Sequence, residues 1–336
     1  MSAPKTPGAL MAAELLEAPG VFARAATQDA GEAARLLQDA PALYTVARGS
    51  SDAAANVLAY ELMRETGLPV TSLPPSVFSI GQGVRMAGAG ALILSQSGAS
   101  DDLVRTARGL RAAGGRVVAI TNVAGSPVEA EAEVTLPIGA GEERAVPATK
   151  SVTGAIGAGM ALISALAPGY GGRAEASAEA IAALETTETP QADALRAALL
   201  RNPHVYVVGR DTGYGAAHEL ALKIKETCAI HAEAYSASEV LHGPLQLVTR
   251  PLLVILLDTG QPFVQESLGT AEARFRAAGG TVLRLSPADL GPGALTPAAA
   301  AALMLMMVYP VILGAARALG HDPDAPATLS KVTQTT

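Results

Sequence analysis

Two short loops carry hydroxyl groups that could bind a phosphate. The first serine loop is RGSSD at residues 48–52, and the second serine loop is SQSGASD at residues 95–101. Each follows a short apolar run and leads into a helical pattern, so the free N–H groups of a helix start would lie beside the hydroxyls. That combination favours a phosphate dianion, although capping of the helices by Ser and Asp is the plainer alternative. The candidate phosphate-binding residues are Gly49, Ser50, Ser51, Ser95, Gln96, Ser97 and Ser100.

A second cluster lies in residues 218–244, HELALKIKETCAIHAEAYSASEVLHGP. Glu219, Lys223 and Glu226 are spaced by four and three residues, which places them on one face of a helix. A surface ladder of ion pairs would have this pattern, and so would a carboxylate base whose pKa is tuned by a lysine. His242 precedes a Gly-Pro turn and is a candidate acid–base group near neutral pH, although a lone loop histidine often has no such role.

An internal repeat organises the chain. RAAGGRVVAI at 111–120 matches RAAGGTVLRL at 276–285, and LILSQSG at 92–98 matches VILLDTG at 254–260. Two shorter echoes occur in the same order at nearly the same offset, so we interpret the chain as two homologous halves. The second half lacks the serines at the equivalent loop, and we therefore expect one phosphate site per chain, in the first half.

Short apolar runs alternate with helical patterns in the first half. Strands are predicted at residues 43–47, 91–94, 117–121 and 132–136, and the pattern at 101–113 predicts a helix. Short strands separated by helices indicate an α/β fold, in which parallel strands are covered by helices on both faces. Ligands of such sheets bind at the carboxyl ends of the strands, where both serine loops fall.

Composition narrows the function classes. The chain has 336 residues, with 49% hydrophobic and 16% charged residues and a formal net charge of −7. The acidic balance argues against a nucleic-acid partner. The single cysteine, Cys228, and the absence of zinc spacing predict no disulfide and no metal site, in keeping with a reducing, cytoplasmic setting. No P-loop or GxGxxG follows a strand, so no cofactor is expected.

Three features of the sequence bear on a membrane location. The N-terminal residues lack the apolar core of a signal peptide, so none is expected. The stretches 151–172 and 296–316 carry no charge and approach the length of a membrane span. Their Gly and Ala content and the proline at 310 favour core or interface helices, so no membrane partner is expected.

Five motifs together resemble the SIS (sugar isomerase) superfamily, and within it the isomerase half of glucosamine-6-phosphate synthase and its stand-alone relatives. They are ARGSSD at 47–52, LSQSGASDD at 94–102, EERAVPATKS at 142–151, ALKIKETCAIHAEAYSASEVLHGP at 221–244 and PATLSKVT at 326–333. The resemblance implies two tandem α/β/α subdomains with mostly parallel five-stranded sheets. The expected organisation is a helical arm over 1–30, subdomains over 31–172 and 200–320, a helical connector over 173–199 and a tail over 321–336 that covers the active site.

The resemblance also implies roles for individual residues. Ser51, Ser95, Gln96, Ser97 and Ser100 match phosphate-binding positions, with Val146 and Ala148 beside the sugar. Glu226 matches the carboxylate that moves a proton between C1 and C2 of the open sugar. His242 matches the histidine of ring opening, which reaches the site of a neighbouring subunit in a homodimer. Lys331 matches the lysine at the sugar carbonyl, and Glu219 and Lys223 match supporting residues.

The chain departs from the synthase pattern. It carries no glutaminase motif, and Ala148 replaces a serine of the family. The leading expectation is a glucosamine-6-phosphate deaminase that releases ammonia and fructose 6-phosphate. Another phosphosugar amine, such as galactosamine 6-phosphate or a fructosamine-type adduct, is one alternative. A non-catalytic sensor of sugar phosphates is the other.

Overall fold

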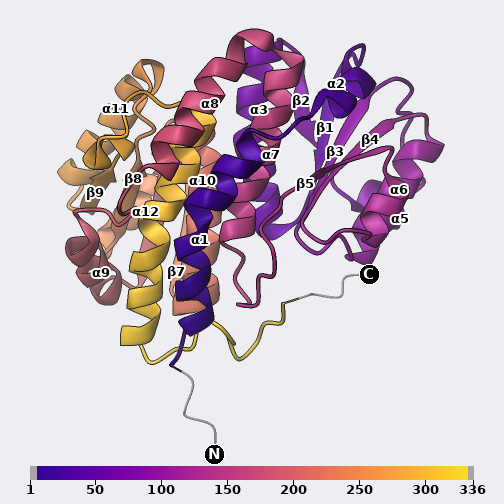
Figure 1. The fold of residues 1–336 in the computed structure, drawn as a ribbon. Helices are drawn as coiled ribbons and strands as arrows, with labels where there is room; N and C mark the ends of the chain where they lie inside the picture. The colour runs from indigo at the N-terminus through magenta and orange to yellow at the C-terminus, as the bar shows by residue number, and fades with distance from the viewer. Residues whose placement is uncertain (1–5, 332–336) are drawn as a thin grey trace, which may run out of the picture. The chain divides into compact units, whose positions relative to one another are not determined.

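The computed structural model describes residues 6–331 of the chain. Residues 1–5 and 332–336, the two ends of the expected arm and tail, lie outside the described residues. The chain forms two compact units, each built around one parallel sheet (Figure 1). The first-sheet unit comprises residues 18–142 and 150–182, and the second-sheet unit comprises residues 6–17, 143–149 and 183–331.

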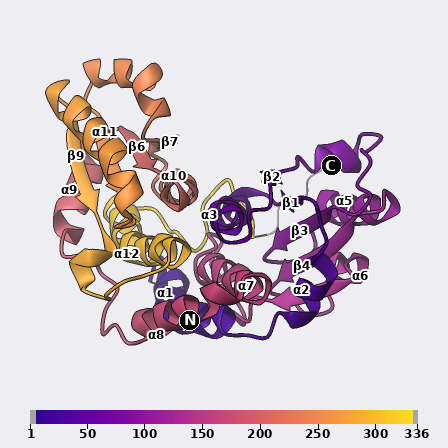
Figure 2. The same cartoon turned by 90° about the horizontal axis from the view of Figure 1, so that it is seen from above.

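The sheet of the first-sheet unit has the strand order β2-β1-β3-β4-β5, with every neighbouring pair parallel. Helices α3 and α7 cover one face, and α5 and α6 cover the other (Figure 2). The strands are β1 (Leu43–Val46), β2 (Val70–Ser72), β3 (Gly90–Ser95), β4 (Arg116–Thr121) and β5 (Val134–Pro137). The helices are α2 (Gly31–Leu37), α3 (Gly49–Thr66), α4 (Ser76–Ser79), α5 (Asp101–Ala112), α6 (Pro127–Glu131), α7 (Lys150–Leu166) and α8 (Pro168–Ala182), and α1 (Ala9–Ala26) starts in the second-sheet unit.

Burial explains why these segments become strands. All six residues of β3 are buried, because helices pack on both faces of this central strand. Helix α3 ends at Thr66, because the next residue, Gly67, adopts a left-handed conformation with φ of 70° and donates its N–H to the carbonyl oxygen of Met63. The four predicted strands are confirmed within one or two residues, whereas the three-residue β2 gave no signal of its own.

The second-sheet unit contains a parallel sheet of order β7-β6-β8-β9. Helices α10 and α12 pack together on one side of this sheet, and α11 packs against β8 and β9. The strands are β6 (His204–Gly209), β7 (His231–Ser236), β8 (Leu253–Leu257) and β9 (Thr281–Leu285). The helices are α9 (Ala192–Arg201), α10 (Thr212–Cys228), α11 (Gln265–Ala277) and α12 (Pro297–Ala318), with 3-10 turns η1 (Glu239–His242), η2 (Pro244–Thr249), η3 (Pro262–Val264) and η4 (Pro287–Leu290).

The expectation of two five-stranded sheets is wrong for this second sheet, which has four strands in the described part of the chain. The segment that would supply a fifth strand after β9 reads SPADLGPGALTP at residues 286–297. Its prolines cannot donate to a ladder, and its glycines weaken a strand, so it forms the turn η4 and leads into α12.

Both charge-free stretches form buried helices. In α7, residues 151–163 are all buried. Helix α12 is the one described helix long and apolar enough to cross a bilayer, and 89% of its apolar window is buried inside the protein. Such burial is typical of a core helix, which agrees with the interpretation made from the sequence.

Candidate active site

The serine loops meet at the point where the first sheet reverses its strand order. Strand β1 lies between β2 and β3, so the chain leaves β1 in one direction and β3 in the other. The first serine loop follows β1 and the second follows β3, at the carboxyl ends of two adjacent parallel strands. Open α/β sheets bind ligands at this position because the loops diverge there and leave a crevice.

An ion pair joins the two loops. Arg48, the N-cap residue of α3, donates through Nε to Oδ2 of Asp102 in the first turn of α5 at 2.9 Å. Asp102 is fully buried, and its Oδ1 accepts the backbone N–H of Leu103 at 2.9 Å. The pair holds the starts of α3 and α5 together, so the N–H groups of both helices lie at the same crevice.

The second serine loop is shaped by its own hydroxyls. Ser95 Oγ accepts the N–H of Gly98 at 3.1 Å, and Ser97 Oγ accepts the N–H of Ala99 at 3.3 Å. Gly98 has φ of 59°, and a Cβ there would lie 2.1 Å from Ser126 Oγ, so no other residue fits.

The capping alternative does not describe these hydroxyls. Ser100 is the N-cap residue of α5, yet its side chain makes no capping hydrogen bond. A serine that accepts a bond also keeps its own O–H to donate. Ser95, Ser97 and Ser100 of the second serine loop therefore retain hydroxyl donors that an anion could use.

In the second-sheet unit, α10 carries the predicted charged face. Lys223 Nζ lies 2.5 Å from Oε2 of Glu226 and 3.4 Å from Oε1 of Glu219. The hydroxyl of Tyr309 on α12 donates to Oε1 of Glu219 at 2.9 Å. Lys223, Glu219 and Tyr309 are fully buried, while the side chain of Glu226 is 23% exposed. A surface ladder is therefore excluded, because only one end of this polar chain reaches solvent.

Burial and charge act in opposite directions on the lysine. Burial would lower the pKa of Lys223, but the carboxylates of Glu219 and Glu226 outweigh it, so the pKa is raised above 10.5 and the ammonium form is favoured. Burial, followed by the charge of Glu219, raises the pKa of Tyr309 well above 10.0, so the phenol keeps its proton. The chain of polar side chains on α10 and α12 thus runs from the neutral phenol of Tyr309 through the carboxylate of Glu219 and the ammonium of Lys223 to the accessible carboxylate of Glu226.

Glu226 opens into a pocket of about 570 Å³. Lys225, Thr227 and Ala229 line the side formed by the end of α10. Residues 320–322 and 325–329 of the C-terminal tail line the other side. A carboxylate with one oxygen on a buried ammonium and access to such a pocket can take and return a proton.

Lys331 of the C-terminal tail lies in the same unit, where its side chain contacts the loop formed by residues 143–149. Its Nζ lies 3.1 Å from Oε2 of Glu143 and 2.7 Å from the carbonyl oxygen of Ala145. Val146 donates its N–H to the carbonyl of Asp324 in the tail at 3.3 Å, and Val146 and Ala148 are both half-buried. The structure thus brings Lys331 to the loop that carries Val146 and Ala148.

His242 is exposed at the end of η1. It lines a separate pocket of about 480 Å³ with Leu241, Gly243 and Gln246, among others. This pocket shares no residue with the pocket of Glu226. Within one chain, the structure therefore does not bring His242 to Glu226.

A family model described as the SIS domain matches residues 36–165 and 198–312. The chain belongs to the SIS domain family. Glutamine–fructose-6-phosphate aminotransferase (isomerizing) of Aeropyrum pernix is 32% identical over 335 residues, which cover 89% of this chain and 52% of that protein. The SIS chain thus spans about half the length of the curated relatives that it matches.

Solved SIS-like structures agree with this fold. A crystal structure from Silicibacter pomeroyi DSS-3, provisionally named a phosphosugar isomerase, has a TM-score of 0.82 at 32% identity and covers 94% of this chain and 99% of that one. Glucosamine-6-phosphate deaminase of Thermotoga maritima has a TM-score of 0.76 and covers 97% of this chain and 100% of that one. Its identity is 19%, so this second likeness shows the fold alone.

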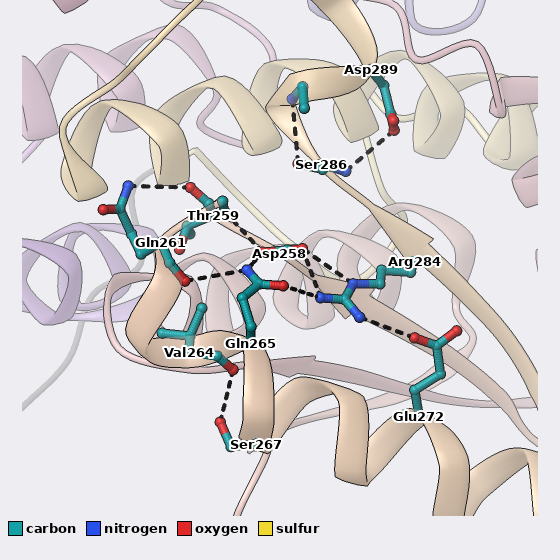
Figure 3. A network of polar contacts seen from close by, with 12 residues as sticks. Asp258, Thr259, Gln261, Val264, Gln265, Ser267, Glu272, Arg284, Ser286 and Asp289 are labelled. Carbon is teal, nitrogen blue, oxygen red and sulfur yellow. Dashed lines mark hydrogen bonds and ion pairs between the residues drawn. The ribbon is translucent and has the colours of Figure 1, made fainter.

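In the second SIS repeat, the loop equivalent to the second serine loop lacks the serines and carries a charged side chain. Asp258, after β8, accepts from Arg284 of β9 at 2.8 Å and from Nε2 of Gln265 at 2.8 Å (Figure 3). Arg284 also bonds Oε1 of Gln265 at 2.6 Å and pairs with Glu272 at 3.2 Å. Asp258 is held by Arg284 and Gln265, and its carboxylate offers no hydrogen-bond donor to a phosphate, which supports the expectation that the phosphate site lies in the first repeat.

Sequence reasoning missed three residues of the second-sheet unit. Tyr309 stands in an apolar stretch with no polar pattern around it, and Glu143 lies within the EERAVPATKS motif without a spacing that singles it out. Glu14 is 4% exposed on α1, yet Oε1 accepts the N–H of Arg144 at 2.5 Å and the N–H of Ala145 at 3.2 Å. The glutamate-rich EERAVPATKS motif could have directed attention to Glu143, whereas the sequence holds no signal for the other two.

Proposed function

We propose that the chain is a sugar-phosphate enzyme of the isomerase type that converts glucosamine 6-phosphate to fructose 6-phosphate and ammonia. The observation that carries the proposal is the partly exposed end of a buried chain of polar side chains: Glu226 bonds to the buried Lys223 and lines a pocket. An aldose–ketose isomerisation requires such a carboxylate, because the same group must take a proton from C2 and return it to C1.

In this mechanism the serine loops bind the phosphate through hydroxyls and helix N–H groups, and so orient the sugar. His242 assists ring opening, and Lys331 contacts the open-chain carbonyl. Glu226 removes the C2 proton and delivers it to C1, while the oxygen on C1 takes the proton that the C2 amine gives up and becomes a hydroxyl. The C2 amine becomes an imine, and water then adds to C2 and releases ammonia.

The names of the relatives support the substrate class. The Aeropyrum pernix relative is an isomerizing aminotransferase of fructose 6-phosphate, and the Silicibacter pomeroyi structure is provisionally a phosphosugar isomerase. Loss of ammonia from an amino sugar is our extension of this class. Another phosphosugar amine would use the same groups, and a sensor would bind the sugar without turnover.

The test is ammonia release from purified protein given glucosamine 6-phosphate, with fructose 6-phosphate measured in parallel. Galactosamine 6-phosphate and glucose 6-phosphate serve as matched substrates. Ammonia and fructose 6-phosphate formed in equal amounts would support the deaminase. A thermal shift by all three compounds without turnover would favour the sensor instead.

We also propose a cytoplasmic homodimer in which His242 acts on the neighbouring subunit's substrate. The separate pockets of His242 and Glu226 within one chain motivate this arrangement. Mixing inactive Glu226→Gln and His242→Ala chains would create heterodimers with one intact site, restoring about a quarter of normal activity. No restoration after verified subunit exchange would contradict a shared site.

A further inference from the structure

Three segments that are far apart in the sequence hold one another around Lys331. They are the start of α1, the loop at residues 143–149 and the C-terminal tail, all within the second-sheet unit. Gly8 donates its N–H to Oδ1 of Asp322 at 2.8 Å, and Leu10 donates to Oδ2 of Asp324 at 2.8 Å. The tail carboxylates therefore cap the start of α1, which fixes this helix against the tail.

Glu14 lies about one turn further along α1 and makes the next connection. Its Oε1 accepts the N–H groups of both Arg144 and Ala145. The backbone of the same loop then holds the lysine, because the carbonyl of Ala145 accepts from Lys331 Nζ at 2.7 Å. Glu143, directly before Arg144, supplies the carboxylate for Lys331 and also accepts the N–H of Thr149 at 3.0 Å.

We propose that Glu14 is a positioning residue: it fixes the backbone at residues 143–145 so that this loop presents Lys331 for reaction. This inference rests on the proposed function, in which Lys331 contacts the sugar carbonyl. A carboxylate that accepts two neighbouring N–H groups restrains two successive peptide planes, and the lysine contacts lie on those residues. Displacing these planes would move both partners of the ammonium at once.

The surroundings of Glu14 agree with a specific task. Burial is the largest influence on its pKa, which is raised above 4.5, and the two backbone N–H groups act against that rise. The charges of Glu143 and Lys331 also act on this carboxyl, in opposite directions. Its other oxygen, Oε2, is buried without a hydrogen-bond partner among residues 6–331. A buried carboxylate with one unsatisfied oxygen is costly, and packing alone would favour an apolar side chain.

Amine labelling tests the inference without any substrate. The chain has five lysines, at positions 5, 150, 223, 225 and 331. Lys225 is exposed on α10 and provides an internal reference for labelling by acetic anhydride, read by mass spectrometry. In Glu14→Leu, both loop N–H groups lose their acceptor, and Lys331 should label about tenfold faster relative to Lys225.

Two further variants separate position from charge. Glu14→Gln keeps a carbonyl oxygen for both N–H groups, so its labelling ratio should stay within about twofold of wild type. Glu17→Leu alters an exposed residue of the same helix and should leave the ratio unchanged. If Glu14→Leu yields no folded protein, Glu14→Asp replaces it, since its shorter side chain cannot reach both N–H groups.

The outcomes separate this inference from the proposed function. An unchanged labelling ratio in Glu14→Leu, or in Glu14→Asp where that variant is needed, would overturn the positioning role. If ammonia release is established, kcat in Glu14→Leu should fall about tenfold with little change in KM, and Glu14→Gln should restore it. Absence of turnover in the wild type would remove the proposed function while leaving the labelling result to stand on its own.

Discussion

The two repeats use one loop geometry for opposite electrostatic purposes. Gly98 and Gly260 occupy equivalent positions after a central strand, and both have positive φ, at 59° and 75°. In each loop an upstream side chain accepts the glycine N–H, through the hydroxyl of Ser95 in the first repeat and the carboxylate of Asp258 in the second. The hydroxyl of Ser95 can still donate a hydrogen bond to an anion. The carboxylate of Asp258 has no hydrogen to donate, and its charge is neutralised by Arg284.

The difference teaches that the sheet sets the location of a loop and the side chains set its chemistry. The first repeat places neutral hydroxyls at helix starts, which suits an anion that arrives with its own charge. The second repeat buries an ammonium between carboxylates on α10, which suits proton transfer. Binding and acid–base chemistry are therefore separable by mutation.

The largest effect is expected from Glu226→Gln. The amide cannot accept the C2 proton, so kcat should fall about 10³-fold, while the binding of sugar phosphate by the first repeat stays nearly unchanged. Steady-state kinetics and substrate thermal shifts measure the two quantities. Glu266→Gln, which alters an exposed carboxylate of the same unit, is the control and should leave both kcat and substrate binding unchanged. Full activity in Glu226→Gln would remove Glu226 from the mechanism.

The next largest effect should follow from giving the first repeat the acidic residue of the second. Gln96 corresponds to Asp258 in the repeat alignment, and Gln96→Asp places a carboxylate beside the expected phosphate. Like charges at this range should raise KM about 100-fold. Because salt screens such repulsion, KM should fall again at high ionic strength. Gln96→Asn is the neutral control, and a normal KM in Gln96→Asp would place the phosphate elsewhere.

A smaller effect is expected on stability from Asp258→Ala. Loss of its bonds to Arg284, Gln265 and Gly260 should lower the free energy of unfolding by about 2 kcal/mol, with KM unchanged. Urea denaturation measures the change. Asp193→Ala is the control. It breaks an ion pair between Arg196 and Asp193, whose side chain is 91% exposed, and should change the free energy of unfolding by less than about 0.5 kcal/mol. A raised KM in Asp258→Ala would show that the second loop also contacts substrate.

The features that could be predicted from the sequence are those determined by local patterns of residues. The serine loops and the charged face of α10 follow from short local patterns of residues, so both were recognisable. Tyr309 and Glu219 are 90 residues apart, and Glu14 and Arg144 are 130 apart, so their bonds depend on tertiary packing. The fifth strand expected in the second sheet shows the converse, because the family resemblance implied a strand that the prolines and glycines of residues 286–297 do not form.

The smallest effect concerns the buried end of the polar chain, in Tyr309→Phe. At neutral pH the variant loses one hydrogen bond to Glu219, which should cost about 1 kcal/mol of unfolding free energy. The pKa of Tyr309 is raised in the folded protein, so above pH 10 the unfolded chain releases a proton that the folded chain keeps. Wild type should therefore lose stability as pH rises past 10, by up to about 1.4 kcal/mol per pH unit from this one group.

The phenylalanine variant lacks that titration. Its stability deficit should shrink above pH 10, and a comparison of urea midpoints at neutral and alkaline pH measures the convergence. A deficit independent of pH would mean that folding does not raise the pKa of Tyr309. The contrast between the neutral hydroxyls of the first repeat and the titrating groups of the second would then rest on Lys223 alone.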